Sequence, residues 1–388
     1  MNRLLDWLVL PRVRPDAALL ISLALIGCIG LVMVGSASVA VADRMTGEPM
    51  YFFYRQAIYA LIGLVVAFLV LHVPLRVWEA NTFTLLGGGL LLLVVVLVPG
   101  IGHAVNGAQR WIDFGPISMQ ASEPARLALI LYVAGYAARR RLELTTSWSG
   151  LFKPMLFMVI ASFLLLLEPD YGAAAILVAV AGLILFLAGA RLLHLVVLAG
   201  AAGGLLVALA LSSPYRVARL VSFADPWAHP YASGFQLTQS LIAIGRGEIA
   251  GVGLGNSVQK LMYLPETHTD FLFAIYAEEF GLIGSLLLIG LFGLVVWRGF
   301  AIGRRALDMD RLFAGFAAYG LSSWLALQAF VNIAVNMGIL PTKGLTLPLM
   351  SYGGSSLVIM CVLCALLIRV DIETRQPESG QSKSRRAG

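Results

Sequence analysis

The sequence has little charge for its length. Asp, Glu, Lys and Arg make up only 12% of its 388 residues, whereas 59% of the residues are hydrophobic. A soluble globular domain carries about 25% charged residues, so this chain cannot enclose all its apolar residues in one water-soluble core. The composition indicates an integral membrane protein whose apolar side chains face lipid.

Cysteine and the common nucleotide-binding motifs are scarce too. Cys28, Cys361 and Cys364 lie inside apolar runs, and the CxxC at the last two lacks a second ligand pair, so we interpret all three as packing residues. The sequence contains no GxSxG, no Walker motif and no dinucleotide-binding GxGxxG after a strand. These absences argue against a reaction driven by a soluble nucleotide.

Apolar runs of the length that crosses a bilayer, roughly 20 residues, recur along the chain. They lie at 17–41, 56–73, 82–98, 122–138, 151–167, 171–190, 192–211, 270–297, 312–337 and 348–369. We therefore predict an all-α polytopic membrane protein of about ten transmembrane helices, seven within residues 17–211 and three within residues 270–369.

The basic residues give these spans an orientation. The net charge is +6, but Lys and Arg occur in short clusters between apolar runs, which is typical of membrane topology and not of a nucleic-acid partner. Two thirds of the 27 Lys and Arg residues fall on one side of the ten predicted spans, so we place both termini in the cytoplasm. Residues 1–16 form the N-terminal segment, and residues 370–388 are expected to be a disordered tail.

One large extracytoplasmic loop, residues 212–268, then joins the seventh and eighth spans. Loops of this length are usually functional or disordered. Because this loop contains an amphipathic stretch at 235–249, we expect it to fold over the membrane surface.

Asp270 is the leading candidate for chemistry, because ionisable groups at membrane depth are costly and mark function by default. It stands in PETHTDF, where the large loop re-enters the bilayer, close to His268. The residues alone leave two readings open, a helix cap and a catalytic base. Glu278 lies ~12 Å further along the helix, too far to form a carboxylate pair with Asp270. We interpret Glu278 and Glu279 as structural partners of a buried Arg or hydroxyl.

A second polar group lies around the third and fourth spans. Glu123 and Arg126 are three residues apart on one helix and can pair. Either they form an internal salt bridge, or Arg126 or Arg110 neutralises a phosphate through its forked donors. Asp170, in EPDYG, is open to the same two readings as Asp270, a helix cap or a functional carboxylate.

Further positive charge follows on the same side at Arg246 and Lys343. Lys343 stands in PTKGLTLPLMSYGGSS, whose Pro and Gly residues break a helix. Irregular backbone at membrane depth is tolerated where it is buried in protein or lines a wet cavity. We expect this segment to line a cavity.

Four blocks of sequence resemble the SEDS family (shape, elongation, division and sporulation) of bacterial cell-wall polymerases. They are NGAQRWIDFG, EPDYG, the stretch from DPWAHPYASGF through LPETHTDF to AEEFG, and NMGILPTKGLTLPLMSYGGSS. The residues of the last two blocks are more similar to the division-site branch of the family than to its elongation branch. The chain departs from the family at Arg126, where Lys is frequent, and at Pro124, where Phe or Leu is frequent.

The resemblance implies a peptidoglycan glycosyltransferase that takes an undecaprenyl-pyrophosphate-linked donor and polymerises lipid II at the division septum of the bacterial inner (cytoplasmic) membrane. It also implies a partner, a class B penicillin-binding protein transpeptidase, along with other divisome membrane proteins. Asp270 stands where the family has its essential aspartate.

The expected chemistry needs a base for the acceptor hydroxyl and cations for the departing pyrophosphate. Asp270 is expected to be the base. The expected contacts to pyrophosphate and sugar are Arg110, Glu123, Arg126, Asp170, Arg246, His268 and Lys343. A divalent cation, Mg²⁺ or Mn²⁺, can supplement them, although the sequence has no dedicated metal cage. A lipid II flippase and a non-enzymatic division scaffold are the rival readings.

Overall fold

The computed structural model describes residues 14–105, 108–115, 117–197 and 234–375, together with 200, 203–204, 223, 225–228 and 230–232. Its helices are α2 (Ala17–Thr46), α3 (Tyr51–His72), α4 (Leu75–Ala80), α5 (Thr82–Val96), α6 (Ser122–Arg139), α7 (Arg141–Thr146), α8 (Trp148–Leu167), α9 (Tyr171–Leu187), α12 (Phe235–Arg246), α13 (Leu272–Asp308), α14 (Leu312–Asn336) and α15 (Gly354–Arg375). Three strands complete it: β1 (Gly102–Val105), β2 (Ala108–Phe114) and β3 (Ile117–Gln120).

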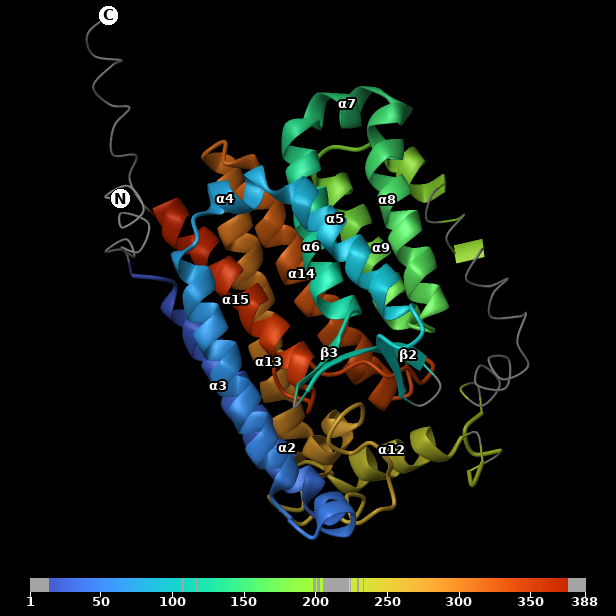
Figure 1. Ribbon diagram of the computed structural model, residues 1–388. Coiled ribbons are helices and arrows are strands. Elements are labelled where there is room, and N and C mark those ends of the chain that lie inside the picture. Colours follow the sequence, from blue (N-terminus) through green and yellow to red (C-terminus); the bar gives the residue numbers. More distant parts are fainter. Residues whose placement is uncertain are drawn as a thin grey trace, which may run out of the picture.

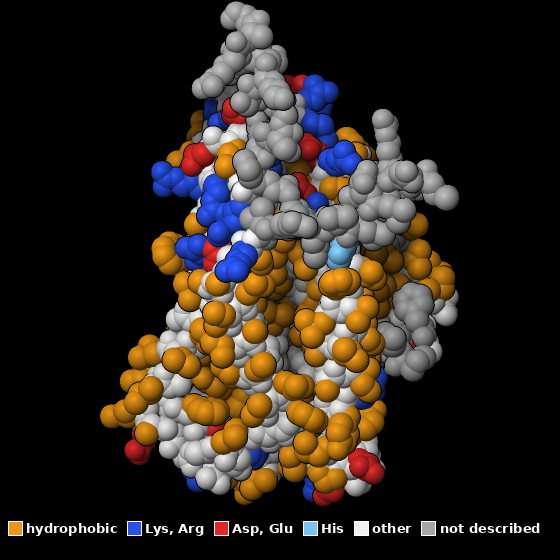
Figure 2. All heavy atoms as spheres, turned by 90° about the vertical axis from the view of Figure 1, so that its left-hand side faces the viewer, with side chains coloured by type: hydrophobic (Ala, Val, Ile, Leu, Met, Phe, Trp, Pro, Cys, Tyr) orange, Lys and Arg blue, Asp and Glu red, His pale blue; other side chains and the backbone are white. Residues whose placement is uncertain are grey.

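The long helices form a bundle with two distinct ends. The strands and α12 lie at one end, which we call the sheet end, and α4 and α7 lie at the other, the α7 end (Figure 1). Within the described residues, α2, α3, α8, α13, α14 and α15 are long and apolar enough to cross a membrane. Hydrophobic side chains cover most of the flank in Figure 2, and basic residues gather near its upper end.

A helix lies over nine of the predicted spans. Of the seventh, 192–211, only residues 192–197, 200 and 203–204 are described, and these are helical. The chain is thus a mostly helical, multi-pass membrane protein. The number of spans and their orientation stay predictions. In the large loop, the amphipathic stretch forms α12 as expected.

The expectation of an all-α fold is wrong in one segment. The three strands form an antiparallel sheet in the order β1-β2-β3, with Trp111 opposite Gln120 in the β2–β3 pair. The segment is too short to return to the membrane as a helix, so its backbone groups pair with one another instead. The sheet places Arg110 over the sheet end of the bundle.

The predicted C-terminal tail also begins too early. Helix α15 runs to Arg375, where Arg375 Nε lies 2.7 Å from Asp371 Oδ1. Asp371 also accepts hydrogen bonds from Arg305 at 2.9 Å and from the backbone N–H of Asp16 at 2.7 Å. Residues 370–375 are therefore an anchored helix end; the rest of the predicted tail lies outside the described residues.

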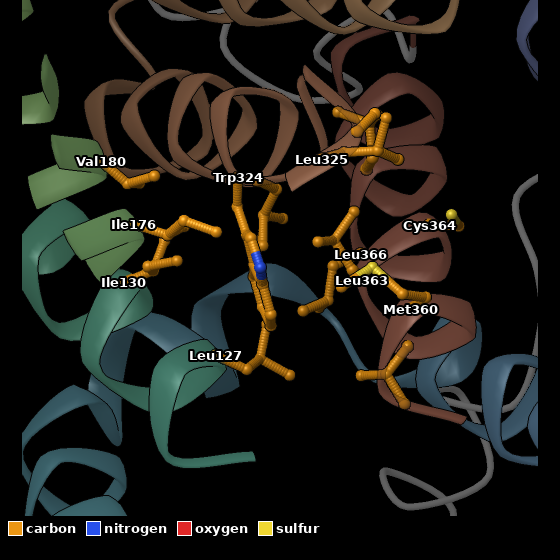
Figure 3. Packing of buried hydrophobic residues seen from close by; sticks show 14 of the residues in the cluster. Leu127, Ile130, Ile176, Val180, Trp324, Leu325, Met360, Leu363, Cys364 and Leu366 are labelled. Atoms are coloured by element: carbon orange, nitrogen blue, oxygen red, sulfur yellow. The ribbon is translucent and has the colours of Figure 1, made fainter. Parts of the chain in front are cut away.

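The bundle core is centred on Trp324 of α14. Its ring lies between Leu127 and Ile130 of α6, Ile176 of α9 and Leu363 of α15 (Figure 3). Trp324 is fully buried. This core fixes α14 against three helices and so sets the position of its polar residues.

Glycines allow the closest contacts around this core. A Cβ at Gly30 of α2 would stand 2.5 Å from the Cα of Met350, and one at Gly63 of α3 would stand 2.8 Å from the Sγ of Cys361. Small residues at such contacts let backbones approach within the membrane. The non-helical chain around Met350 is held this way against α2.

Candidate active site

Asp270 lies in the turn that leads into α13 at the sheet end. Helix α13 begins at Leu272 and its N-cap residue is Phe271, so Asp270 is not the N-cap. The main-chain oxygen of Asp270 accepts hydrogen bonds from Asn332 Nδ2 at 2.9 Å and Asn336 Nδ2 at 3.0 Å. Two side-chain amides of α14 therefore fix the backbone that carries the carboxylate.

The same two asparagines bind the neighbouring chain. Asn336 Oδ1 accepts from the N–H of Ala274 at 3.1 Å, and Asn332 Nδ2 donates to the carbonyl of Leu345 at 2.6 Å. Sequence reasoning missed both residues. Their signal was a row of amides at Gln328, Asn332 and Asn336, each four residues apart, which places all three on one face of the helix.

The non-helical segment between α14 and α15 packs directly against Asp270. A Cβ at Gly344 would stand 3.0 Å from Asp270 Oδ2, so a larger residue there would press on the carboxylate. The carbonyl of Thr346 accepts from Gln328 Nε2 at 3.0 Å, and Met350 is fully buried. Leu345 and residues 347–351 of the irregular segment are thus buried in protein, whereas Lys343 and Gly344 are exposed. A cavity of about 580 Å³ lies beside Ser36, and the expectation that the irregular segment lines a cavity stays a prediction.

Asp170 serves as a cap and as a link to the sheet. It is the N-cap of α9, with Oδ1 3.0 Å from the N–H of Ala173. Its Oδ2 accepts from Gln120 Nε2 and Ser122 Oγ, both at 3.0 Å. The capping reading is therefore correct. The ammonium group of Lys343 lies 5.1 Å from the centre of the adjacent Tyr171 ring, which brings Lys343 to the same corner as Asp170.

Arg126 and Glu123 form the internal pair, at 3.8 Å. Arg126 is only 1% exposed, donates to Gln328 Oε1 at 3.0 Å and lies 5.0 Å from the Trp324 ring centre. Gln328 in turn binds Thr346. Arg126 therefore supports the non-helical segment from within, and its expected contact with substrate stays a prediction.

Arg246 is also remote from Asp270. It lies 3.1 Å from Glu278, which also accepts from the hydroxyl of Ser257. The neighbouring Glu279 lies 2.8 Å from the Lys260 ammonium group. The structural interpretation of Glu278 and Glu279 is confirmed, and Arg246 clamps the large loop onto α13.

His268 packs within an aromatic group next to the catalytic candidate. Its ring centre lies 4.5 Å from that of Phe52 and 5.6 Å from that of Tyr352, and its carbonyl accepts from the N–H of Tyr352 at 2.8 Å. Burial lowers the pKa of His268, although Glu266 opposes this shift. A neutral imidazole at pH 7 follows, so His268 is a poor phosphate-binding cation.

Arg110 and Glu168 both have buried side-chain atoms without a hydrogen-bond partner. Arg110 is half-buried and its Nε has no hydrogen-bond partner. Glu168, in the turn between α8 and α9, is 0% exposed and neither of its oxygens has a partner. Burial raises the pKa of Glu168 to about 8; the nearby Asp170 raises it further and Arg110 opposes the shift. Sequence reasoning treated Glu168 only as a connector between two spans.

The described residues contain no group of three or more His, Cys, Asp or Glu arranged to hold a metal ion. Mg²⁺ is commonly held by one or two carboxylates together with substrate phosphates and water. Asp270 would suit that mode as a single carboxylate, and the cation would supply positive charge for the pyrophosphate.

The chain matches known proteins over nearly all of its length. The pattern of the FtsW, RodA and SpoVE family, described as cell cycle proteins, matches residues 16–376. The probable peptidoglycan glycosyltransferase FtsW of Nitrosococcus halophilus is 54% identical over 366 residues, covering 94% of each chain. The protein of the same description from Thioalkalivibrio sulfidiphilus is 52% identical over 362 residues, covering 93% of this chain and 90% of that one.

Solved structures agree with these sequence matches. A chain from a peptidoglycan synthase complex that coordinates polymerization and crosslinking is similar at a TM-score of 0.76 and 31% identity, over 94% of this chain and all of that one. The rod shape determining protein RodA of Thermus thermophilus is similar at a TM-score of 0.70 and 31% identity, over 94% of this chain and 99% of that one. The chain therefore belongs to the FtsW, RodA and SpoVE family, which is the SEDS family that its motifs resemble.

Proposed function

We propose that this chain, a peptidoglycan glycosyltransferase of cell division, polymerises lipid II into glycan strands with Asp270 as its general base. Asp270 is assigned as the base because neighbouring residues hold the turn on which it lies. Asn332 and Asn336 hold its backbone, and Gly344 keeps space beside its carboxylate. Such preorganisation of one carboxylate is what a positioned base requires.

The reaction joins a sugar hydroxyl of one lipid-linked chain to the anomeric carbon of another. Asp270 takes the proton of the acceptor hydroxyl, the oxygen forms the new bond to the anomeric carbon, and the bond from that carbon to the pyrophosphate breaks. The electron pair leaves with the pyrophosphate. The reaction needs no nucleotide, because the energy comes from the bond to the leaving group.

The departing pyrophosphate needs positive charge. Lys343 is one residue from Gly344, which contacts Asp270, and Arg110 lies in the sheet that is tied to Asp170 through Gln120. We propose these two cations as the pyrophosphate clamp, with a divalent cation at Asp270 as a supplement. Arg126 and Arg246 pair with Glu123 and Glu278 within the bundle, and we propose that they act as supports.

We further propose that the sheet end faces the extracytoplasmic side of the bacterial inner membrane at the septum. There the chain would work beside a class B penicillin-binding protein and other divisome membrane proteins. The similarity to a chain from a complex that couples polymerization with crosslinking supports a transpeptidase partner.

Reconstitution separates this proposal from the lipid II flippase. The chain and its transpeptidase partner are placed in liposomes with lipid II in both leaflets and with Mg²⁺. We expect glycan polymer on the sheet-end side; translocation of lipid II without polymer would overturn the enzyme proposal. At the α7 end, Asp16 and Asp371 are paired with arginines, which supports a structural role for these two carboxylates and not one in moving a substrate.

A further inference from the structure

Arg110 occupies a special position in the sheet. In the pairing of β1 with β2, His103 lies opposite Trp111 and Ala104 lies opposite Gln109, so the register shifts and Arg110 has no partner residue. It is the extra residue of a β-bulge. Bulges interrupt a ladder locally and re-aim a side chain, and they are frequent beside active sites.

Beside this bulge stands an unpaired buried acid. Glu168 is fully enclosed, and both of its oxygens and the Nε of Arg110 lack hydrogen-bond partners. A buried charge without a partner is strongly unfavourable, so a carboxyl group in this position is neutral or has a counter-ion. The charged groups that act on Glu168 among the described residues are Asp170, at the start of α9, and Arg110 on β2.

The two acids in this turn differ in their bonding. Asp170 has accepted hydrogen bonds from Ala173, Gln120 and Ser122 and is satisfied as a carboxylate. Glu168 has none, and burial favours its neutral, protonated form. The cation that acts on Glu168 is Arg110, which lies at the bulge, outside the regular β1–β2 register.

We infer that Glu168 is a positioning residue for Arg110, leaving the arginine free for a pyrophosphate when Glu168 is neutral and withdrawing it into an ion pair when Glu168 is ionised. This inference rests on the proposed role of Arg110 in the pyrophosphate clamp. The protonation balance is simple: an ionised Glu168 takes up one proton from solvent when a pyrophosphate draws Arg110 away from it. Substrate binding and proton uptake are therefore linked at this turn.

The test measures the Kd of the full-length protein for fluorescent lipid II between pH 6.5 and 9.5. Because the folded-state pKa of Glu168 is raised, its neutral form is present below about pH 8 and is lost above it. We expect the wild-type Kd to rise by up to about tenfold per pH unit above that point, the limit for one linked proton. Glu168→Gln, which cannot ionise, is expected to show a flat profile.

Two further variants separate positioning from a merely structural role. Arg110→Gln is expected to weaken binding at every pH and to abolish the pH slope, and adding Glu168→Gln to it should change nothing further. Asp113→Asn removes an exposed carboxylate from the same strand and should keep the wild-type slope.

The inference would be overturned if the Kd of Glu168→Gln rose with pH as steeply as that of wild type. It would also be overturned if the changes in binding free energy caused by Glu168→Gln and by Arg110→Gln were additive in the double variant. The readout is binding, so it does not depend on the base. Asp270→Asn protein should show the same slope, which separates a failure of this inference from a failure of the proposed base.

Discussion

Polar side chains at the sheet end fall into two groups. Glu278, Glu279 and Arg126 are buried in ion pairs and hold chain segments together. Asp270 forms the second group, in which two side-chain amides fix the backbone and a glycine lies beside the carboxylate. This support of its backbone is the feature that points to Asp270 as the candidate catalytic group.

Asn332→Ala tests the support of Asp270. The change removes the donor to two carbonyls, those of Asp270 and Leu345, and each unsatisfied buried group costs about 1–3 kcal/mol. We expect a lower polymerisation kcat, at least tenfold, with the KM for lipid II changed much less. Asn256→Ala, at an exposed amide with a local bond to Val252, is the control and should leave both values as they are.

The sequence was informative about single residues where a local rule applies. Asp170 caps a helix, and the spacing of Asp270 and Glu278 excluded a carboxylate pair, because both follow from helix geometry. The roles of Asn332 and Glu168 depend on which face of α14 meets Asp270 and on where the sheet lies. Those are tertiary facts that spacing along the chain does not contain.

At the scale of elements, the large loop is joined to α13 at a break in that helix. Gly281 has φ 64° and ψ −161° inside α13, and the N–H groups of Val252 and Gly253 bind the carbonyls of Glu278 and Glu279 at 3.0 Å. A positive φ of this kind favours glycine. The large loop, which leads into the turn of Asp270, is thus docked by backbone hydrogen bonds as well as by ion pairs.

Gly281→Ala tests this docking. A Cβ there would overlap the backbone of Gly251 and would also be strained by the positive φ. We expect a loss of more than ~1 kcal/mol of stability and faster proteolysis of the loop, measured by thermal unfolding and limited digestion. Gly290→Ala, also in α13 but with open space around it, should be neutral or slightly stabilising. Equal behaviour of the two variants would contradict the docking account.

Elements were predicted well where hydrophobicity marks them and poorly elsewhere. Bilayer-length apolar runs located α2, α3 and α14, since lipid imposes both length and composition. The sheet was missed because its strands are short and lie between two spans. Helix α15 extends beyond the end of its apolar run at residue 369. Asp371 and Arg375 stabilise this last turn through an ion pair, which hydropathy does not reveal.

The whole bundle is tied together at the α7 end by one charge network. Asp16 at the start of α2 pairs with Arg298 of α13 and with Arg375 of α15, while Asp371 pairs with Arg305 and Arg375. Three helices that are distant in sequence are thereby joined. The network lies at the opposite end from the candidate active site, so its role is to hold the bundle together.

Asp371→Asn should therefore lower stability. It leaves two arginines without part of their countercharge, and breaking such a buried network costs about 3 kcal/mol. We expect a lower melting temperature, with lipid II polymerisation retained in the protein that remains folded. Glu143→Gln removes an exposed partner of Arg140 and Lys153 and should leave the melting temperature within error. A loss of polymerisation in folded Asp371→Asn protein would contradict a purely structural network.

The central claim is that one carboxylate, Asp270, performs the proton transfer. The direct measurement is glycan polymer formed from lipid II and Mg²⁺ by the purified chain with its transpeptidase partner, comparing wild type, Asp270→Asn and the nearby control Glu266→Gln. We predict polymer from wild type and Glu266→Gln and none from Asp270→Asn, with all three forming the complex equally. Polymer from Asp270→Asn at the wild-type rate would contradict the account.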